Sequence, residues 1–400
     1  MTRRLKVAVV GAGFSNSLDG RERWAIRAHL PALRALPDRY EVVALCTTRT
    51  ETAAAAARHF EVPHAFGDVQ QMLHDVDDID VVCVSVRPAV QHGVVMTALR
   101  AGKHVYCEQP LGLTTAQAEE MRQLAEDKHV RTVVGHQTHY EPAVLHMAEL
   151  VRQGYIGRPL TFAQTEFFSN YILPRPAHRQ WLFQAEMGGH PGYRSGQGLE
   201  RLTAVLRQDV TEISATMDTK VVERANLDGG PPIRSNQVDN MSYLLRVGDA
   251  IEGTLQVSFT AWFGTGTRFE IYGTEGMLML APGSSPGRGS GELRLYGARA
   301  NLDQVMKDRK TPERLERDFE EVPGSEAYRH VALQQGGRDV FLVAQTWRAL
   351  SEAIESGREC SPSFHDKVRI HRVWDAAERS TRERRWITVD YSGLGMRRQA

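Results

Sequence analysis

VAVVGAGF, residues Val7–Phe14, decides the fold of the N-terminal half of this chain. Four apolar residues typical of a buried strand lead into two glycines separated by one residue. The first glycine permits a tight turn, and the second lets backbone N–H groups approach a pyrophosphate where the next helix begins. Asn16 replaces the third glycine of the usual pattern, and an apparent insertion precedes a helix at Trp24. The stretch predicts a dinucleotide-binding turn, with an ordinary tight strand-to-helix turn as the alternative.

Short β-branched runs alternate with alanine-rich stretches on both sides of this turn. Near-continuous apolar strands separated by helices are typical of a parallel sheet covered on both faces. The first domain, residues 1–143, is therefore predicted to be a doubly wound α/β domain. Its strands are expected at residues 6–10, 41–46, 81–86, 104–107 and 131–135, and its helices at 24–36, 50–60, 90–101 and 115–128.

The pattern changes from about residue 160, where strands follow one another without helices between them. This indicates an α+β domain, residues 144–400, built on an open mixed or antiparallel sheet. An apolar face left uncovered between residues 238 and 280 would be buried against another copy, so we expect a homo-oligomer. Strands are expected at residues 161–168, 210–219, 238–247, 252–259, 267–272 and 277–280, and helices at 337–355 and 364–381.

Composition excludes several classes of protein. The 400 residues are 42% hydrophobic and 24% charged, which is typical of a globular chain. Lys+Arg and Asp+Glu both number 49, and this zero net charge disfavours nucleic-acid binding. No apolar run approaches the length of a membrane span, and no signal-peptide pattern opens the chain. The four cysteines lie far apart, which indicates reduced thiols in a cytoplasmic protein without a zinc site.

The end of the second predicted strand bears on the choice of dinucleotide. An NAD site usually places an acidic residue there, to accept hydrogen bonds from the ribose 2′-OH. Thr47, Thr48 and Arg49 stand there instead and would suit a 2′-phosphate. We therefore expect NADP or NAD, with NADP slightly favoured. Alternatively, the two threonines only cap the helix at residues 50–60.

The chain resembles the Gfo/Idh/MocA oxidoreductase family over nearly its whole length. The most specific string is AGKHVYCEQP, residues 101–110. The spacing and the tryptophan that starts the first helix are most similar to the branch containing the galactose-regulon repressor, which binds dinucleotide without known turnover. Further matching strings are WAIRAHLPAL at residues 24–33, QH at 91–92, QGYIG at 153–157, IYGTEG at 271–276 and the helix segment at 362–380.

The resemblance implies a Rossmann domain, a C-terminal mixed sheet and a bound NAD or NADP between them. Family members typically transfer a hydride to or from a sugar or cyclitol carbon. The resemblance also places Glu108 near the nicotinamide ribose and implies a cis bond before Pro110. The cofactor-binding residues we expect are Gly11, Gly13, Phe14, Thr47, Thr48, Arg49, Ser85, Arg87, His92, Glu108 and Gln109.

Two family signatures are altered. The catalytic lysine of the family's Glu-Lys-Pro is Gln109 here, and an amide offers only neutral hydrogen bonds. The family's Asp-x-Gly-x-His-x-x-Asp places its first Asp at Arg194, its His at Gly198 and its last Asp at Arg201. Because general acid–base catalysis contributes typically about 10²–10⁴-fold, the usual chemistry by the usual residues is not expected.

Other side chains are candidates for transferring the substrate proton. Imidazoles titrate near neutral pH and a tyrosine can donate a proton, although most histidines in proteins are structural. The candidate catalytic residues are His190, Tyr193, His136 and His139, in that order. Candidates for substrate binding are Arg194, Trp181, whose ring can stack on a sugar, and Gln197. The guanidinium of Arg194, and that of Arg201 beside it, suits an anionic substrate group, with surface salt bridges as the alternative. No metal site is expected, because His136 and His139 lack a further ligand.

Three functions fit these observations. The first is an NAD(P)-dependent oxidoreductase acting on a sugar-like small molecule with non-standard acid/base residues. The second is a non-catalytic, dinucleotide-bound regulator that binds a protein partner. The third is an NAD-assisted lyase or hydrolase. Retained cofactor binding fits all three, so turnover is the discriminating observation.

Overall fold

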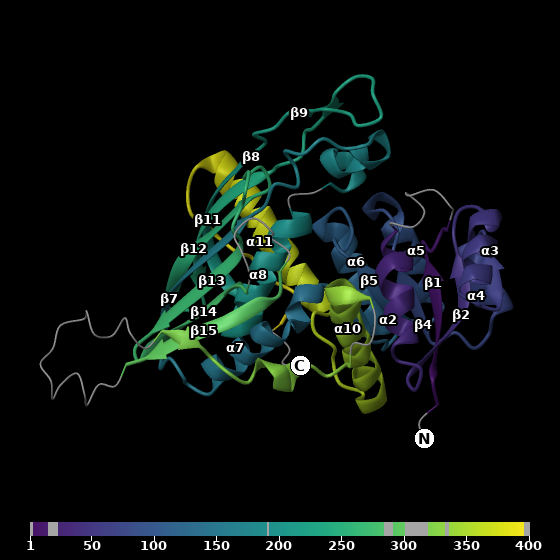
Figure 1. Ribbon diagram of the computed structural model, residues 1–400, viewed down its shortest axis with the longest axis horizontal. Coiled ribbons are helices and arrows are strands. Elements are labelled where there is room, and N and C mark those ends of the chain that lie inside the picture. The colour runs from purple at the N-terminus through teal and green to yellow at the C-terminus, as the bar shows by residue number, and fades with distance from the viewer. Residues whose placement is uncertain are drawn as a thin grey trace, which may run out of the picture. The chain divides into compact units, whose positions relative to one another are not determined.

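The computed structural model describes residues 3–14, 23–189, 192–283, 291–300, 319–332 and 336–395, with the backbone alone for 192–196 (Figure 1). By its contacts the chain forms two compact units. The first comprises the residues up to Gln137 together with His330–His371, and the second comprises Thr138–Arg329 and Arg372–Arg397. The sequence-based division placed everything after residue 143 in one domain. The structure instead returns His330–His371 to the N-terminal unit.

The first unit is built on a six-stranded parallel sheet, in the order β3-β2-β1-β4-β5-β6. The order reverses between β1 and β4, which is the place where such sheets bind ligands. The predicted doubly wound Rossmann fold is confirmed, and β3 is a strand that the sequence did not predict. The strands are β1 Leu5–Val10, β2 Tyr40–Cys46, β3 His64–Phe66, β4 Val81–Val84, β5 His104–Glu108 and β6 Thr132–Gly135.

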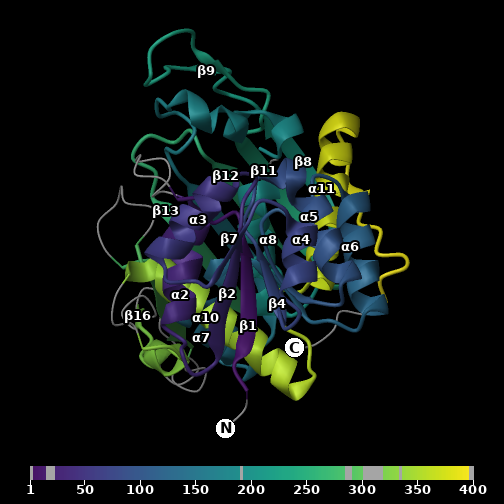
Figure 2. The ribbon, with the colours of Figure 1, turned by 90° about the vertical axis from the view of Figure 1, so that its right-hand side faces the viewer.

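Helices cover both faces of this sheet (Figure 2). The segments η1, α2 and α10 pack together on one side, and α4, α5 and α6 on the other. Thr114 caps α6, because its hydroxyl accepts the N–H of Gln117. The helical segments are η1 Ala25–His29, α2 Leu30–Arg34, α3 Thr50–His59, α4 Val69–Asp75, α5 Pro88–Arg100, α6 Thr115–Asp127 and α10 Gly337–Ser356. Helix α11, Phe364–Glu383, begins in this unit and ends in the second.

Trp347 explains why α10 belongs to the first unit. Its side chain is fully buried, and its ring packs against the rings of Tyr40, Tyr106 and His29. The Tyr40 hydroxyl also donates a 2.6 Å hydrogen bond to the Trp347 carbonyl. A residue from the C-terminal part of the chain thus fills the core under the N-terminal strands.

The second unit contains a large sheet, in the order β16-β15-β14-β13-β7-β12-β11-β8-β17 among the described residues. Only the β7–β12 pair is parallel there, so the expected mixed sheet is confirmed. Its strands are β7 Pro159–Phe167, β8 Val210–Asp218, β11 Asn240–Val247, β12 Ile251–Ser258, β13 Gly266–Gly273, β14 Gly276–Pro282, β15 Leu293–Arg299, β16 Glu320–Glu321 and β17 Ile387–Thr388. A small hairpin pairs β9 Glu223–Arg224 with β10 Ile233–Arg234. Helices α7 Pro142–Arg152 and α8 Gly192–Leu206 lie on one face of the large sheet (Figure 1).

The opposite face of this sheet differs from the apolar surface that the sequence predicted. Leu244 and Tyr272 are exposed on this face. Arg246, however, forms ion pairs there with Glu212 and Glu252 on the neighbouring strands. Strict alternation puts the apolar residues of these strands on the buried face. The expectation of an apolar outer face is therefore wrong, and the homo-oligomer stays a prediction. Among the described residues, no helix has the length and hydropathy needed to cross a membrane.

Candidate functional site

The carboxyl ends of the parallel strands bring most of the predicted cofactor residues to one edge of the first unit. Gly11 follows β1, Thr47 follows β2 and Ser85 follows β4. Glu108 ends β5 and pairs in register with Gly135, the last residue of β6. Ligands bind at this edge in doubly wound sheets.

The turn after β1 requires glycine at position 11. Gly11 has φ of 102°, and a Cβ there would lie 2.1 Å from the carbonyl oxygen of Ser85. A Cβ on Gly13 would lie 2.5 Å from Nη1 of Arg23 and 3.6 Å from Cγ2 of Thr47. A larger residue at position 11 would therefore collide with the backbone, whereas at position 13 the end of the exposed Arg23 side chain would have to move. The backbone here can approach a ligand closely, as a pyrophosphate site demands.

Arg23 is a residue of this edge that sequence reasoning missed. Its side chain is exposed and its guanidinium lies over Gly13, with no ion-pair partner among the described residues. The predicted Arg49 is exposed as well, at the N-cap of α3. A guanidinium over this turn and a second arginine after β2 favour a phosphate-bearing ligand. Arg23 is the last residue of the apparent insertion and belongs to no recognisable motif, so no sequence pattern indicated it.

The predicted threonines mainly organise the local backbone. The buried Thr47 hydroxyl donates to the carbonyl of Arg49 at 2.7 Å and accepts the Arg49 N–H at 3.2 Å. The alternative that the threonines cap α3 is not what the structure shows, because Arg49 is the N-cap and no side chain caps the helix. Thr48 is exposed, and the ring of Phe14 stacks on His59 with a centroid separation of 4.5 Å.

The segment after β4 places Gln91, rather than the predicted His92, against the site. The fully buried Gln91 amide nitrogen lies 2.6 Å from the carbonyl oxygen of Glu108 and 2.8 Å from that of Pro110. It thus holds the turn containing the cis Gln109–Pro110 bond, which the family resemblance implied. His92 instead contacts Glu120 on α6 at 2.9 Å. The predicted Arg87 is exposed and precedes α5.

Glu108 is held by donors from three segments. Its Oε1 accepts hydrogen bonds from Trp24 at 3.1 Å, His29 at 3.0 Å and Gln137 at 3.2 Å. The indole N–H of Trp347 lies 3.2 Å from Nδ1 of His29. Because an indole N–H only donates, Nδ1 of His29 accepts and Nε2 carries the proton given to Glu108. The carboxylate is therefore fixed before any ligand arrives.

Beside Glu108, the amide of Gln109 receives a buried lysine. The Gln109 Oε1 accepts a hydrogen bond from Nζ of Lys367 at 3.0 Å, and its Nε2 donates to the carbonyl of Gly135 at 3.2 Å. Lys367 is 1% exposed and lies in the first turn of α11. Burial lowers the pKa of Lys367 well below its ordinary value, against the opposing effects of Glu108 and Cys107. No local sequence pattern predicts this pair, because its members are 258 positions apart.

The predicted catalytic residues are distributed over both units. His136 is fully buried in the first unit, directly after β6. His139 belongs to the second unit, on the short helix η2 (Gln137–Tyr140), where its ring lies 4.9 Å from that of Tyr140. His190 lies outside the described residues. Tyr193 lies on α8, and its side chain is likewise outside the described part of the chain.

The predicted substrate-binding residues all belong to the second unit. Trp181 is half-buried on the short helix η3 (Ala177–Phe183), and Gln197 is half-buried on α8. Arg194 lies on the first turns of α8, and its side chain is outside the described residues.

Arg201, a second arginine considered for anion binding, is committed elsewhere. Its side chain is 1% exposed, and Nη1 lies 2.7 Å from Oε1 of the equally buried Glu166. A guanidinium engaged in a buried ion pair serves the fold of the second unit, so the expectation of an anion-binding Arg201 is wrong.

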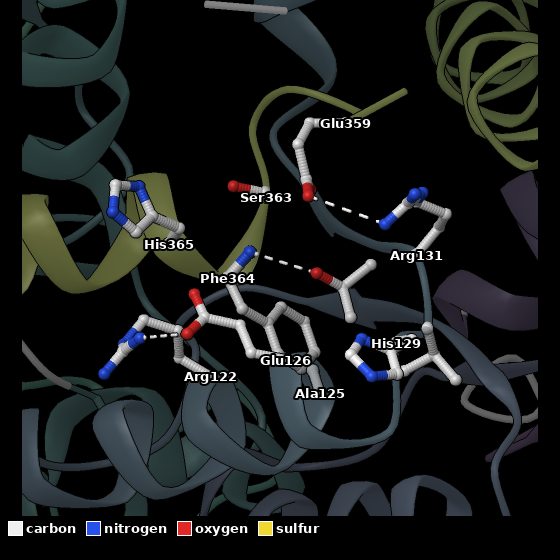
Figure 3. Close-up of a pocket in the computed structure, with 11 residues that line it drawn as sticks. Arg122, Ala125, Glu126, His129, Arg131, Glu359, Ser363, Phe364 and His365 are labelled. Carbon is white, nitrogen blue, oxygen red and sulfur yellow. Dashed lines mark hydrogen bonds and ion pairs between the residues drawn. The ribbon is translucent and has the colours of Figure 1, made fainter. Parts of the chain in front are cut away.

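A cavity of about 280 Å³ lies at the opposite edge of the first unit's sheet, near Thr132 at the start of β6 (Figure 3). Its charged walls are paired with one another, Arg122 with Glu126 and Arg131 with Glu359. These pairs leave little net charge to attract an ionic ligand. We therefore place the candidate site at the carboxyl edge. No group of three metal-ligating side chains is found in the part of the chain that the structure describes.

The fold and the carboxyl edge together define a dinucleotide-binding oxidoreductase of the Rossmann type. Comparison with known families agrees. The family described as "Oxidoreductase family, NAD-binding Rossmann fold" matches residues 5–136, and the "GFO/IDH/MocA C-terminal domain" matches residues 144–279. Together these matches span more than half of the chain. The protein belongs to the Gfo/Idh/MocA oxidoreductase family.

Individual relatives include both enzymes and a regulator. Levoglucosan dehydrogenase of Pseudarthrobacter phenanthrenivorans is 24% identical over 97% of this chain and 98% of the relative. The galactose/lactose metabolism regulatory protein GAL80 of Saccharomyces cerevisiae is 24% identical over 76% of this chain and 74% of the relative. Among solved structures, an NAD binding oxidoreductase from Klebsiella pneumoniae is 25% identical, with a TM-score of 0.78 over 98% of this chain and 100% of that one.

Proposed function

We propose that this protein is an NAD(P)-dependent oxidoreductase that transfers a hydride at a hydroxyl or carbonyl carbon of a sugar-like, polyhydroxylated small molecule. The observation that carries the proposal is the preformed carboxyl edge. A turn without room for a Cβ at Gly11 lies at the same edge as a carboxylate that three donors hold rigidly. The match to sugar-oxidising family members supports the substrate class.

The residues at this edge fit a dinucleotide. The Gly11–Gly13 backbone would hold the pyrophosphate, and Glu108 would hold the ribose next to the nicotinamide. Phe14, Ser85 and Arg87 would line the cofactor between these points. When bound, the cofactor would supply the hydride acceptor or donor. The chain's own task is then to orient the substrate and move its hydroxyl proton.

Arg23 and Arg49 support a preference for NADP. Both are exposed near the turn, and a guanidinium bonds a 2′-phosphate more strongly than a 2′-hydroxyl. Calorimetric titration should show NADP binding at least as tightly as NAD. Arg23→Ala and Arg49→Ala should weaken NADP more than NAD, whereas Arg100→Ala, at the far end of α5, should change neither affinity. Tenfold tighter binding of NAD to the parent, a difference of about 1.4 kcal/mol, would contradict this preference.

The proposed activity is tested by nicotinamide absorbance with a broad panel of sugars, polyols and their oxidised forms. Turnover with at least one of them is expected. The variant Gly11→Val should lose cofactor binding altogether, because its branched side chain would collide with the Ser85 carbonyl. A parent protein that binds neither NAD nor NADP would refute the proposal.

The proton-transfer group should not be Gln109, because an amide has no usable ionisation. Our sequence-based candidates are His190, Tyr193, His136 and His139, and each is tested by its effect on kcat/KM once a substrate is known. The histidines are replaced by Ala and the tyrosine by Phe. Substrate contacts are proposed for Arg194, Trp181 and Gln197, whose replacement by Ala should raise KM more than it lowers kcat.

A second function, a non-catalytic dinucleotide-bound regulator, is favoured by one observation. A neutral amide occupies position 109, and the regulatory protein GAL80 is among the relatives. A stoichiometrically bound cofactor that no compound of the panel reduces or oxidises would favour this function over the enzyme.

A further inference from the structure

We propose that Lys367 is a catalytic residue of this site, and that its amine exchanges a proton with the substrate hydroxyl or carbonyl oxygen. It would thereby replace the lysine that the family carries at position 109. The inference rests on the oxidoreductase function proposed above, and it names a residue that belongs to neither family signature.

The position of the amine carries the argument. Nζ of Lys367 lies 3.0 Å from Oε1 of Gln109, so the amine begins where the side chain of residue 109 ends. Gln109 is itself held by its hydrogen bond to the Gly135 carbonyl. A lysine at position 109 would reach about one bond further than a glutamine. The Lys367 amine on α11 thus lies beside position 109, where family members carry their catalytic lysine directly after β5.

The backbone around Lys367 is tied to the strand edge. The N–H of Val134 donates to the carbonyl of Pro362 at 2.9 Å, and the N–H of Phe364 donates to the Thr132 hydroxyl at 3.2 Å. The Asp366 carboxylate accepts the N–H of Ser363 at 2.9 Å and so caps the first turn of α11. A catalytic side chain needs such support to stay within a fraction of an ångström of its working position.

A neutral amide is one of the groups that contact the Lys367 amine. The atom that accepts its hydrogen bond at Gln109 belongs to a neutral amide, and the nearby Glu108 carboxylate is engaged by Trp24 and His29. Burial then favours the neutral amine and lowers the pKa of Lys367, although Glu108 and Cys107 on β5 oppose the effect. A lysine that ionises closer to neutral pH can both accept and donate a proton.

Two ionisable neighbours on the same helix complete this environment. Asp366 precedes Lys367 and is occupied by its capping bonds, and the buried His371 follows one turn later. The Asp366 carboxylate therefore serves the backbone and hydroxyl groups at the start of α11.

The use of lysine in this chain points the same way. Lys and Arg together number 49, and only seven of these residues are lysines. Arginine is therefore the usual cation of this sequence, yet a lysine occupies this fully buried position. Arginine cannot give up its proton in a protein, whereas a desolvated lysine can.

The resulting step balances. In the oxidative direction the substrate C–H bond breaks, and its hydrogen leaves as a hydride to NAD(P)⁺. The substrate O–H bond also breaks, its proton passes to the neutral Lys367 amine, and a C=O bond forms. The ammonium of Lys367 then releases the proton to solvent. In the reductive direction the ammonium protonates the oxygen as the hydride arrives.

The first experiment observes Lys367 directly, without turnover. Lysine labelled with ¹³C at the ε carbon is followed by NMR against pH, and Lys367→Met assigns one of the seven signals. The acid dissociation constant of Lys367 should be about tenfold larger with NADP⁺ than with NADPH bound, because a cationic ring nearby disfavours a second positive charge. Lys220, on the second unit, should titrate identically with both forms and is the internal control.

The second experiment exchanges the two side chains. Lys367→Met should lower kcat/KM by about 10²–10⁴-fold, whereas the surface control Lys220→Met should leave it unchanged. The double variant Gln109→Lys/Lys367→Met, which restores the family's lysine, should recover activity to within about tenfold of the parent. Thermal unfolding of each variant verifies that it is folded.

The outcomes separate the two proposals. A protein that binds no dinucleotide overturns the proposed function. A protein that binds it, but whose Lys367 titrates identically with both redox forms, overturns the role of Lys367 and leaves the oxidoreductase standing. An active Lys367→Met variant, within about threefold of the parent, overturns that role as well.

Discussion

Two cations are buried to the same degree in the two units, yet their environments differ. Arg201 in the second unit is 1% exposed and forms a 2.7 Å ion pair with the carboxylate of Glu166. Lys367 in the first unit is also 1% exposed, but its Nζ donates to the neutral amide of Gln109. The attraction between opposite charges offsets the lost hydration of Arg201. The Lys367 hydrogen bond to Gln109 joins a cation to a neutral amide. The Arg201 contact is structural, whereas we propose a chemical role for Lys367.

The largest effect is expected from breaking the ion pair. Arg201→Met should lower the free energy of unfolding by about 3–5 kcal/mol, because it leaves the Glu166 carboxylate buried without its cation. Chemical denaturation measures this. Arg246→Met, at an exposed ion pair on the open face of the sheet, is the matched control and should cost no more than about 1 kcal/mol. Equal losses in the two variants would remove the distinction between the buried and exposed pairs.

Replacing the lysine should act in the opposite direction. Lys367→Met is expected to raise the free energy of unfolding by about 1–4 kcal/mol near neutral pH, since a buried polar group gives way to an apolar chain of similar volume. A loss of activity together with a gain in stability is the mark of a residue kept for chemistry. A destabilised Lys367→Met variant would show that Lys367 serves the fold, as Arg201 does.

This difference should also depend on pH. The pKa of Lys367 is lowered well below its unfolded value of 10.5, so the unfolded state binds more protons between the two values. The stability of the parent contributed by this group therefore rises with pH in that interval. Below the folded pKa both states are protonated, and the full penalty for the buried charge applies. The stability gap between Lys367→Met and the parent should be widest at low pH and should narrow as pH approaches 10.5.

A smaller effect should follow from changing the charge beside the lysine. Glu108→Gln removes the carboxylate that opposes the lowering of the Lys367 pKa. The acid dissociation constant of Lys367 should therefore increase about tenfold. The ¹³C titration described above measures the change. Glu120→Gln, whose carboxylate pairs with His92 on the outer helices, should leave the Lys367 titration unaltered.

The smallest effect is expected at Gln109. Gln109→Ala removes one neutral hydrogen bond to Lys367 and one to the Gly135 carbonyl. The cost should be about 0.5–1.5 kcal/mol in transition-state stabilisation, or no more than about tenfold in kcat/KM. A loss as large as that of Lys367→Met would assign the chemistry to the amide and contradict our ranking of the two residues.

Features that depend on neighbouring residues were predictable from the sequence. The apolar run before Gly11 identified β1, and the string around Glu108 identified the turn with the cis bond before Pro110. β3 was missed because its three residues, His64–Phe66, are one exposed and two half-buried and form no recognisable period. His92 was chosen in place of Gln91 because helical residues one position apart point about 100° apart, and the motif alone did not fix the rotation.

Features that depend on distant segments were not predictable. Trp347 and Lys367 contact His29 and Gln109 only because the chain folds back on itself. No local propensity encodes a contact over 258 positions. The prediction of an apolar outer face for the second sheet was wrong for a related reason. Strand periodicity tells which residues share a face, but not which face the helices cover.

The return of the C-terminal segment to the first unit has a consequence for synthesis. The Trp347 indole orients His29, and Pro362 accepts the N–H of Val134 on β6. The strands of the first unit are thus completed by residues synthesised well after them. Domains generally fold as the chain emerges, with the N-terminal one first. Here the nascent Rossmann sheet must wait for residues 330–371 with its α10 face uncovered, a period in which a chaperone would protect it.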